Sequence, residues 1–192
     1  MKFRSLLLLL VATHVCGATA VRAEAAAEPA AELCLQAIAA EEPRHAWLPE
    51  GLMRAMALVE SGHVEPGGAR AVPWPWTINS PAGSFYLSSR AEAVAKVEEL
   101  QAQGVSNIDV GCMQVSLLYH PRAFESLDQA FDPATNVAYA AGFLSALKAE
   151  GASVFGAVGR YHSRTPVLGV MYARKVFARW GYGGRLGRGG AG

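Results

Sequence analysis

The sequence has no surplus of charge of either sign, since 17 Lys and Arg residues face 16 Asp and Glu residues in a chain of 192. No segment gathers enough basic residues to predict binding to nucleic acid. The chain has five histidines, and the spacing of His63, His120 and His162 matches no metal site. We find no internal repeat and no second long apolar run after the N-terminus. These absences argue against nucleic-acid-binding proteins, metal-dependent enzymes and integral membrane proteins.

The N-terminus carries the one segment with a targeting pattern. Lys2 and Arg4 precede an apolar run over residues 6–12, and small residues follow up to Ala23. This order is typical of a signal peptide, and the run is too short to span a bilayer. We predict that residues 1–23 are removed after Ala23, with Ala20 as the alternative site. A retained N-terminal anchor is the other interpretation. Cleavage would place the protein in the periplasm or outside the cell.

Removal of this leader takes away three of the 17 basic residues and none of the acidic ones, so the net charge becomes −2. About 169 residues remain, which is enough for one domain with a substantial core. The pattern divides the chain into a signal peptide (1–23), a linker (24–31), a single domain (32–182) and a flexible glycine-rich tail (183–192).

Two cysteines remain after processing, Cys34 and Cys112. An exported protein meets an oxidising compartment, where an even pair of cysteines tends to form a disulfide. The bond would close a loop of nearly eighty residues, worth about 4 kcal/mol in the chain-entropy model. The alternative is two separate buried thiols.

Hydrophobic periodicity predicts a mainly α fold, a single helical domain with a small β-hairpin insertion. The hairpin joins residues 77–79 to 84–87 through a Ser-Pro-Ala-Gly turn. Ser89, with Glu92 three residues later, has the pattern of a capping box, and Asp132 precedes Pro133 as a helix cap. The predicted helices cover residues 32–43, 49–60, 89–104, 114–118, 132–151, 153–162 and 166–180.

Glu60 is the most informative residue. It ends an apolar helix, where the negative end of the helix dipole disfavours a carboxylate. Apolar surroundings would also raise its pKa. Both effects keep the proton on the carboxyl at neutral pH, as a general acid requires. The alternative is an ordinary solvated glutamate at a helix end.

Two further segments carry candidate binding residues. Gly111 permits a tight turn, after which Met113 offers an apolar wall and Gln114 a donor and an acceptor suited to sugar hydroxyl and acetamido groups. Tyr161 ends a later helix, and its hydroxyl could reach Glu60 or a substrate. Taken alone, the first segment could be an ordinary start of a helix, and Tyr161 could be a core residue.

Trp74 and Trp76 lie in a proline-rich loop, Pro-Trp-Pro-Trp. Aromatic faces on a loop can stack on sugar rings. The two tryptophans could equally anchor the loop to the body of the domain.

Taken together, these segments resemble the family 1 lytic transglycosylase (SLT) domain of bacteria, a lysozyme-like fold that cleaves peptidoglycan. Glu60-Ser61 matches the family's Glu-Ser motif, and residues 111–114 match Gly-Leu-Met-Gln with Cys112 in place of leucine. Residues 136–144 are similar to the family's Asn-Ile-x-x-Gly-x-x-Tyr-Leu helix. The Ala-Tyr-Asn-x-Gly motif is matched at Tyr161 alone, because His162 stands at its asparagine and Arg164 at its glycine.

The resemblance implies that Glu60 is the sole catalytic acid and base, and that Ser61, Met113, Gln114 and Tyr161 are groove and support residues. The substrate would be the β-1,4 MurNAc–GlcNAc strand of peptidoglycan. The product would be a 1,6-anhydro sugar, formed without metal or cofactor. Single-domain relatives often open the wall for secretion, conjugation or flagellar systems, whose components would then be partners.

Two alternatives stay open. One is lysozyme-type hydrolysis, with Asp109 or Glu65 positioning a water molecule. The other is a non-catalytic glycan-binding or scaffold protein of an envelope machine, which the altered motif at Tyr161 and His162 favours.

Overall fold

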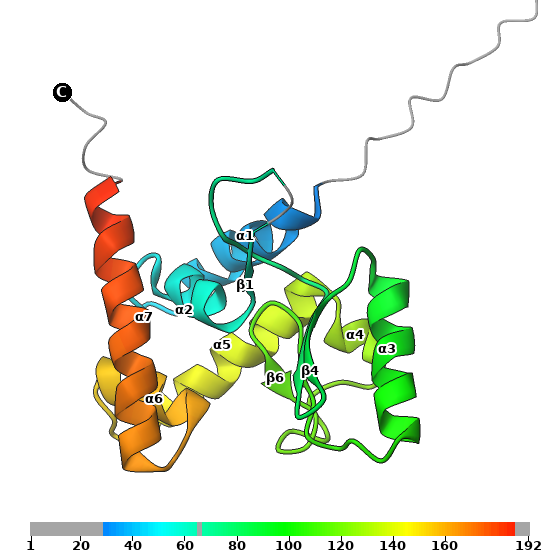
Figure 1. The fold of residues 1–192 in the computed structure, drawn as a ribbon. Coiled ribbons are helices and arrows are strands. Elements are labelled where there is room, and N and C mark those ends of the chain that lie inside the picture. The colour runs from blue at the N-terminus through cyan, green and yellow to red at the C-terminus, as the bar shows by residue number, and fades with distance from the viewer. Residues whose placement is uncertain (1–28, 65–66, 187–192) are drawn as a thin grey trace, which may run out of the picture.

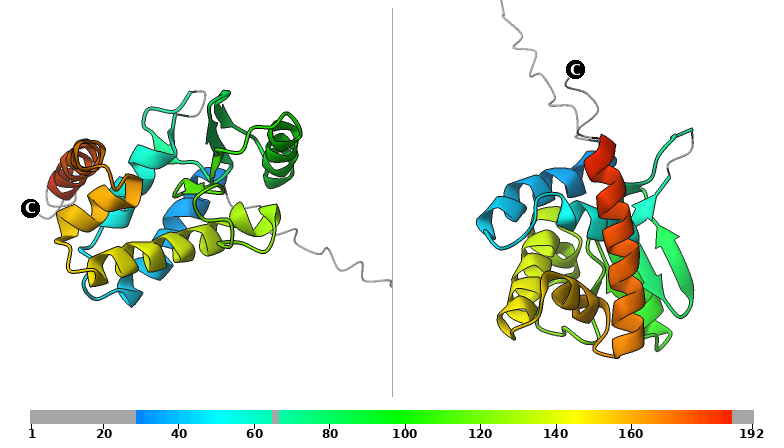
Figure 2. Two further views of the ribbon diagram at one scale, coloured as in Figure 1. Left: turned by 90° about the horizontal axis from the view of Figure 1, so that it is seen from below. Right: turned by 90° about the vertical axis from the view of Figure 1, so that its left-hand side faces the viewer.

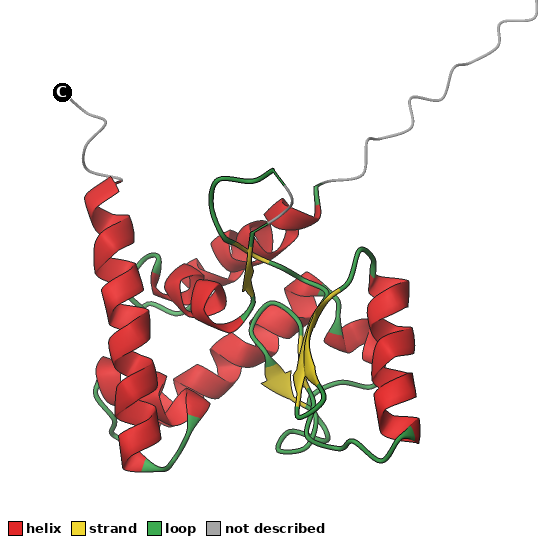
Figure 3. Cartoon of the chain, in the orientation of Figure 1, coloured by secondary structure: helices red, strands yellow, loops and turns green. Residues whose placement is uncertain are grey.

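The computed structural model describes residues 29–64 and 67–186. The predicted signal peptide, residues 24–28 of the predicted linker, Glu65 and the end of the chain from residue 187 lie outside these residues. The helices are α1 (Ala30–Glu41), the 3₁₀ helix η1 (Glu42–Arg44), α2 (Leu52–Glu60), α3 (Arg90–Ala102), α4 (Leu127–Ala130), α5 (Pro133–Ala149), α6 (Val154–His162) and α7 (Pro166–Leu186). The strands are β1 (Gly62–His63), β2 (Val72–Pro73), β3 (Thr77–Ser80), β4 (Gly83–Tyr86), β5 (Asp109–Val110) and β6 (Val115–Ser116). The expected mainly α class with a small hairpin is confirmed (Figure 3).

Helix α5 runs across the middle of the molecule and separates two groups of elements (Figure 1). On one side, α1, α2, α6 and α7 share with α5 a core of buried apolar side chains, among them Leu52, Met56, Leu144 and Val176. On the other side, α3 and α4 cover the sheet over a second core that includes Ile78 and Phe131. Both views of Figure 2 keep α7 on the outside of the helical group.

The predicted hairpin is confirmed as β3 and β4, which pair antiparallel from Thr77↔Tyr86 to Ser80↔Gly83. The chain returns to it later, so that the full sheet has the order β4-β3-β5-β6. This return brings Asp109 of β5 beside Asn79 of β3, thirty positions apart in the sequence.

The predicted short helix over 114–118 is wrong. Gln114 has φ 48°, in the left-handed region that ends regular structure. Val115 then pairs with Val110 in the sheet and is buried. The apolar pattern of this segment is therefore that of a strand beside a core.

Several predicted boundaries also differ. Helix α2 begins at Leu52, not at Pro49, because Gly51 has φ +77° and the Glu42 carboxylate accepts hydrogen bonds from Gly51 N (2.8 Å) and Met53 N (2.9 Å). Helix α1 begins at Ala30, inside the predicted linker. Helix α7 continues to Leu186, past the predicted start of the tail at residue 183.

The predicted helix caps are present. Ser89 Oγ accepts from Glu92 N (3.2 Å), and Asp132 Oδ1 accepts from Thr135 N (2.9 Å). The Glu92 carboxylate accepts from the backbone of Ser88 rather than of Ser89, so the box closes one residue earlier than expected.

Cys34 and Cys112 form a disulfide, with Cα atoms 5.7 Å apart. The alternative of two separate thiols is therefore wrong. A disulfide is compatible with a protein that is secreted or resides in the periplasm. Within residues 29–64 and 67–186, no helix is both long enough and apolar enough to cross a membrane.

Candidate functional site

A cleft of about 630 Å³ opens where the helical core meets the sheet. Its walls come from the end of α2, from β3, from the segment that includes β5 and β6, from α5 and from the end of α6. It gathers the ionisable groups Glu60, Asp109, His120 and His162, together with Arg160 and Arg164. The remaining lining residues are Asn79, Asn107, Gln114, Val115, Ser116, Tyr119, Tyr139, Phe143, Tyr161 and Ser163.

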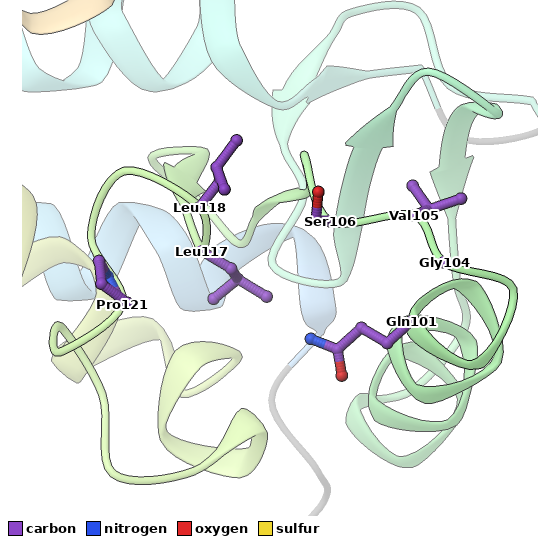
Figure 4. A pocket seen from close by; sticks show the side chains of 7 residues that line it. All are labelled: Gln101, Gly104, Val105, Ser106, Leu117, Leu118 and Pro121. Carbon is purple, nitrogen blue, oxygen red and sulfur yellow. The ribbon is translucent and has the colours of Figure 1, made fainter.

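A second hollow, of about 430 Å³, lies between the end of α3 and the segment after β6 (Figure 4). It is lined by Gln101, Gly104, Val105, Ser106, Leu117, Leu118 and Pro121. None of these side chains can donate or accept a proton near neutral pH. The first cleft is therefore the candidate active site.

Glu60 lies at the end of α2, whose opposite face is fixed in the core by Leu52, Met53 and Met56. The residue keeps some exposed surface, but protein atoms surround its carboxyl densely. This desolvation raises the pKa of Glu60 from 4.5 to about 8. The Tyr172 hydroxyl lowers the pKa in part, and the charge of Asp109 raises it slightly. At neutral pH the carboxyl therefore carries its proton.

Two tyrosines, Tyr161, which is half-buried, and Tyr172, which is buried, lie close to this carboxyl. The pKa values of Tyr161 and Tyr172 are raised, first by burial and next by the negative charge that Glu60 carries when ionised. The Tyr172 hydroxyl makes no hydrogen bond of standard geometry, yet it is near enough to the Glu60 carboxyl to lower its pKa. It is a donor available to the carboxylate once Glu60 has lost its proton.

The turn over residues 111–114 forms the wall beside Glu60, and Gly111 is required there. Gly111 has φ +83°, and a Cβ at this position would lie 2.4 Å from Asn136 Nδ2. The chain thus needs glycine for its conformation and for the close approach of α5.

Four separate elements hold this turn. The Asn136 side chain on α5 donates to Val110 O (3.0 Å) and Ala130 O (2.9 Å) and accepts from Met113 N (2.9 Å). Ser61, at the end of α2, donates to Cys112 O (2.7 Å). Tyr161 on α6 donates to Met113 O (2.8 Å). The disulfide joins Cys112 to α1. Ser61 and Met113 are fully buried, so both support the wall from behind.

Gln114 lies in the cleft itself. Its amide nitrogen donates to Thr77 O (3.1 Å) and Gly111 O (3.0 Å), and its amide oxygen is buried without a partner. Among the described residues, Gln114 is the one residue other than glycine with positive φ. Strained backbone with an unpaired acceptor often marks a functional position.

Asp109 is the second carboxyl of the cleft. The pKa of Asp109 is raised overall, because desolvation raises it by more than Ser116, His162 and His120 together lower it. Burial lowers the pKa of His120 and of His162, and the charge of Asp109 opposes the change in both. The two histidines are also held in place, since His120 Nδ1 bonds to Tyr139 Oη (2.9 Å) and His162 stacks on Tyr172 at 4.7 Å.

The two predicted tryptophans do not line the cleft. Trp74 is 9% exposed, and its indole nitrogen donates to Leu87 O (2.7 Å). Its ring also contacts Trp76 edge-on, with centroids 5.9 Å apart. Trp74 therefore anchors its loop, the alternative that the sequence left open, whereas Tyr119, 75% exposed, is the aromatic side chain at the cleft that is open to solvent.

The sequence thus identified Glu60, Gln114 and Tyr161, which the structure brings into one cleft. It did not identify Asn136 as the anchor of the turn, or Tyr172 as a neighbour of Glu60. An asparagine at helical spacing with apolar residues, as Asn136 is with Ala140 and Leu144, would have been a usable signal for the first. Tyr172 carries no such signal, because tyrosine is common in amphipathic helices.

Within residues 29–64 and 67–186, no group of three or more His, Cys, Asp or Glu side chains could hold a metal ion. Comparisons of the chain with family models, with curated proteins and with solved structures gave no match.

Proposed function

We propose that this protein is a lytic transglycosylase of the cell envelope, which cleaves the β-1,4 bond between MurNAc and GlcNAc in peptidoglycan. The observation that carries the proposal is the Glu60 carboxyl, which lies in an open cleft with a pKa raised to about 8. A protonated, desolvated carboxyl in a cleft is suited to general acid catalysis of glycosidic cleavage. The resemblance of residues 60–61 and 111–114 to the SLT motifs supports the same assignment.

In the first step, Glu60 donates its proton to the glycosidic oxygen. The bond from this oxygen to the anomeric carbon of MurNAc breaks, and GlcNAc leaves with a free 4-hydroxyl. Positive charge develops at the anomeric carbon, and the acetamido group of the same sugar shields it. Glu60 is now a carboxylate, and the nearby Tyr172 hydroxyl stabilises that charge.

In the second step, the Glu60 carboxylate accepts the proton of the MurNAc 6-hydroxyl while the oxygen bonds to the anomeric carbon. The product is a 1,6-anhydro ring, no water is consumed, and Glu60 regains the proton with which it began. One carboxyl thus serves first as acid and then as base.

Other residues of the cleft suit a sugar chain. Asn79, Asn107 and Gln114 supply amide groups, which can pair with hydroxyl and acetamido groups. The exposed ring of Tyr119 offers a face for stacking on a sugar. The predicted signal peptide and the disulfide support an envelope location, where this polymer is found.

A second candidate is hydrolysis of the same bond, which the position of Asp109 favours. Its carboxyl shares the cleft with Glu60 and could orient a water molecule toward the anomeric carbon. The hydrolysis product contains one more water molecule than the 1,6-anhydro product.

Mass spectrometry of the muropeptides released from purified sacculi tests the proposal. We expect anhydro ends, lighter by one water than reducing ends, from both the wild-type chain and Asp109→Asn. Reducing ends that vanish in Asp109→Asn would assign hydrolysis instead. Tight binding to sacculi with no released product would assign the scaffold protein and overturn both enzymatic assignments.

A further inference from the structure

Helix α7 exposes a face that the cleft does not use. Its other face is packed on α2 and α6 through the buried residues Gly169, Tyr172, Ala173 and Val176. The helix lies along the outside of the molecule, as the right-hand view of Figure 2 shows. Any ligand of the outward face is therefore independent of the proposed function.

The outward face has large apolar side chains near the start of the helix. Their exposed fractions are Val167 68%, Leu168 49%, Val170 41% and Met171 53%. Val167 and Met171 are thus more than half exposed to water, and the other two are more than two fifths exposed. Such grouping marks an interaction site.

The same face continues with cations. Val167, Met171, Arg174 and Ala178 follow one another at helical spacing, and Lys175 and Arg179 lie beside this line. All three cations are exposed. Within the described part of the chain, their side chains form no ion pair and no hydrogen bond. Residues 166–186 contain no Asp or Glu at all, in a chain whose charges are otherwise balanced.

We propose that the outward face of α7 docks on the surface of an anionic phospholipid bilayer. An interfacial helix inserts an apolar strip and keeps Lys and Arg beside it for the lipid headgroups. A second copy of this chain would place like charges against each other. An anionic sugar polymer would leave the four apolar side chains without a partner. Docking would hold the cleft, built partly by α6, next to the membrane.

Binding to lipid vesicles tests the proposal with the chain from residue 24 onward, made in an oxidising compartment. This chain contains every helix, every strand and the disulfide described. We expect sedimentation with vesicles of phosphatidylcholine and phosphatidylglycerol, little with phosphatidylcholine alone, and weaker binding at higher salt. Replacing Arg174 and Arg179 together by Gln should weaken binding about 25-fold, and Met171→Ser should weaken it as well.

The matched control is the double change Arg54→Gln with Arg122→Gln, which removes two exposed cations from other elements. It should bind as the unchanged chain does, and thermal unfolding of all variants should show that the fold is intact. Equal binding to both kinds of vesicle, or equal loss in control and α7 variants, would overturn the proposal. So would a dimer, seen by sedimentation equilibrium, that Met171→Ser dissociates.

Discussion

At the scale of single residues, Glu60 shows a conflict between stability and the proposed function. Its pKa is higher in the folded chain, about 8, than the 4.5 of an unperturbed glutamate. The folded state therefore holds this proton more tightly than the unfolded state, and ionisation disfavours folding. Below about pH 4.5, Glu60 is protonated in both states and does not lower the free energy of unfolding. As the pH rises from there toward 8, the free energy of unfolding falls because the unfolded state ionises first. At pH 7 the loss is about 3 kcal/mol.

We therefore expect Glu60→Gln to be more stable than the unchanged chain at neutral pH. The gain should be near zero at pH 4, about 3 kcal/mol at pH 7 and about 5 kcal/mol at pH 9. Urea unfolding at each pH measures it, with Glu98→Gln, an exposed position on α3, as the control. A gain that does not change with pH would show that Glu60 has an ordinary pKa.

Which site residues could be found from the sequence depends on how local their signals are. Glu60 follows directly on its own apolar helix, and Gly111 and Gln114 share one turn. Asp109 stood out less, because its part in the cleft depends on pairing with Ser116 and Asn79. A sequence pattern shows which residues are neighbours along the chain. It does not show which residues, distant in the sequence, surround a carboxyl in the fold and remove its water.

At the scale of elements, the turn over 111–114 depends on Asn136. This side chain satisfies three buried backbone groups at once, and it is fully buried. Its loss would leave one N–H and two carbonyl groups without these bonds, at a cost of about 3 kcal/mol. The same contact makes Gly111 necessary, since the two residues touch.

Three variants test this dependence by urea unfolding. Gly111→Ala and Asn136→Ala should each cost about 3 kcal/mol. In the double variant the clash disappears, so the combined loss should be smaller than the sum by about 1 kcal/mol or more. Gly142→Ala is the control, because that glycine on α5 has open space around its Cα and should lose nothing. Strictly additive losses would contradict the account.

The elements themselves were largely predictable, and their boundaries less so. Helix caps such as Ser89 and Asp132 bond to residues within one turn of the helix, so the local sequence predicts them. The start of α2 depends instead on the Glu42 carboxylate from the preceding helix, which no local pattern reveals. Strand β6 was mistaken for a helix because its pairing partner, Val110, decides its conformation.

At the scale of the whole molecule, the cleft lies where two cores meet, and one disulfide secures the junction. Cys34 and Cys112 are 78 positions apart, and closing a loop of that size stabilises the chain by about 4 kcal/mol. Because Cys112 belongs to the turn beside Glu60, the bond also ties α1 to the wall of the cleft. The proposed chemistry thus depends on contacts from α1, α2, α5 and α6 together.

The central claim is that the Glu60 proton is the one transferred to the glycosidic oxygen. The most direct measurement is the rate at which purified sacculi release soluble fragments with Glu60→Gln, beside the unchanged chain and Glu98→Gln. We expect the first variant to release less than about a thousandth of the normal rate while unfolding no more easily at neutral pH, and Glu98→Gln to be normal. Release by folded Glu60→Gln at a rate close to that of the unchanged chain would contradict the account.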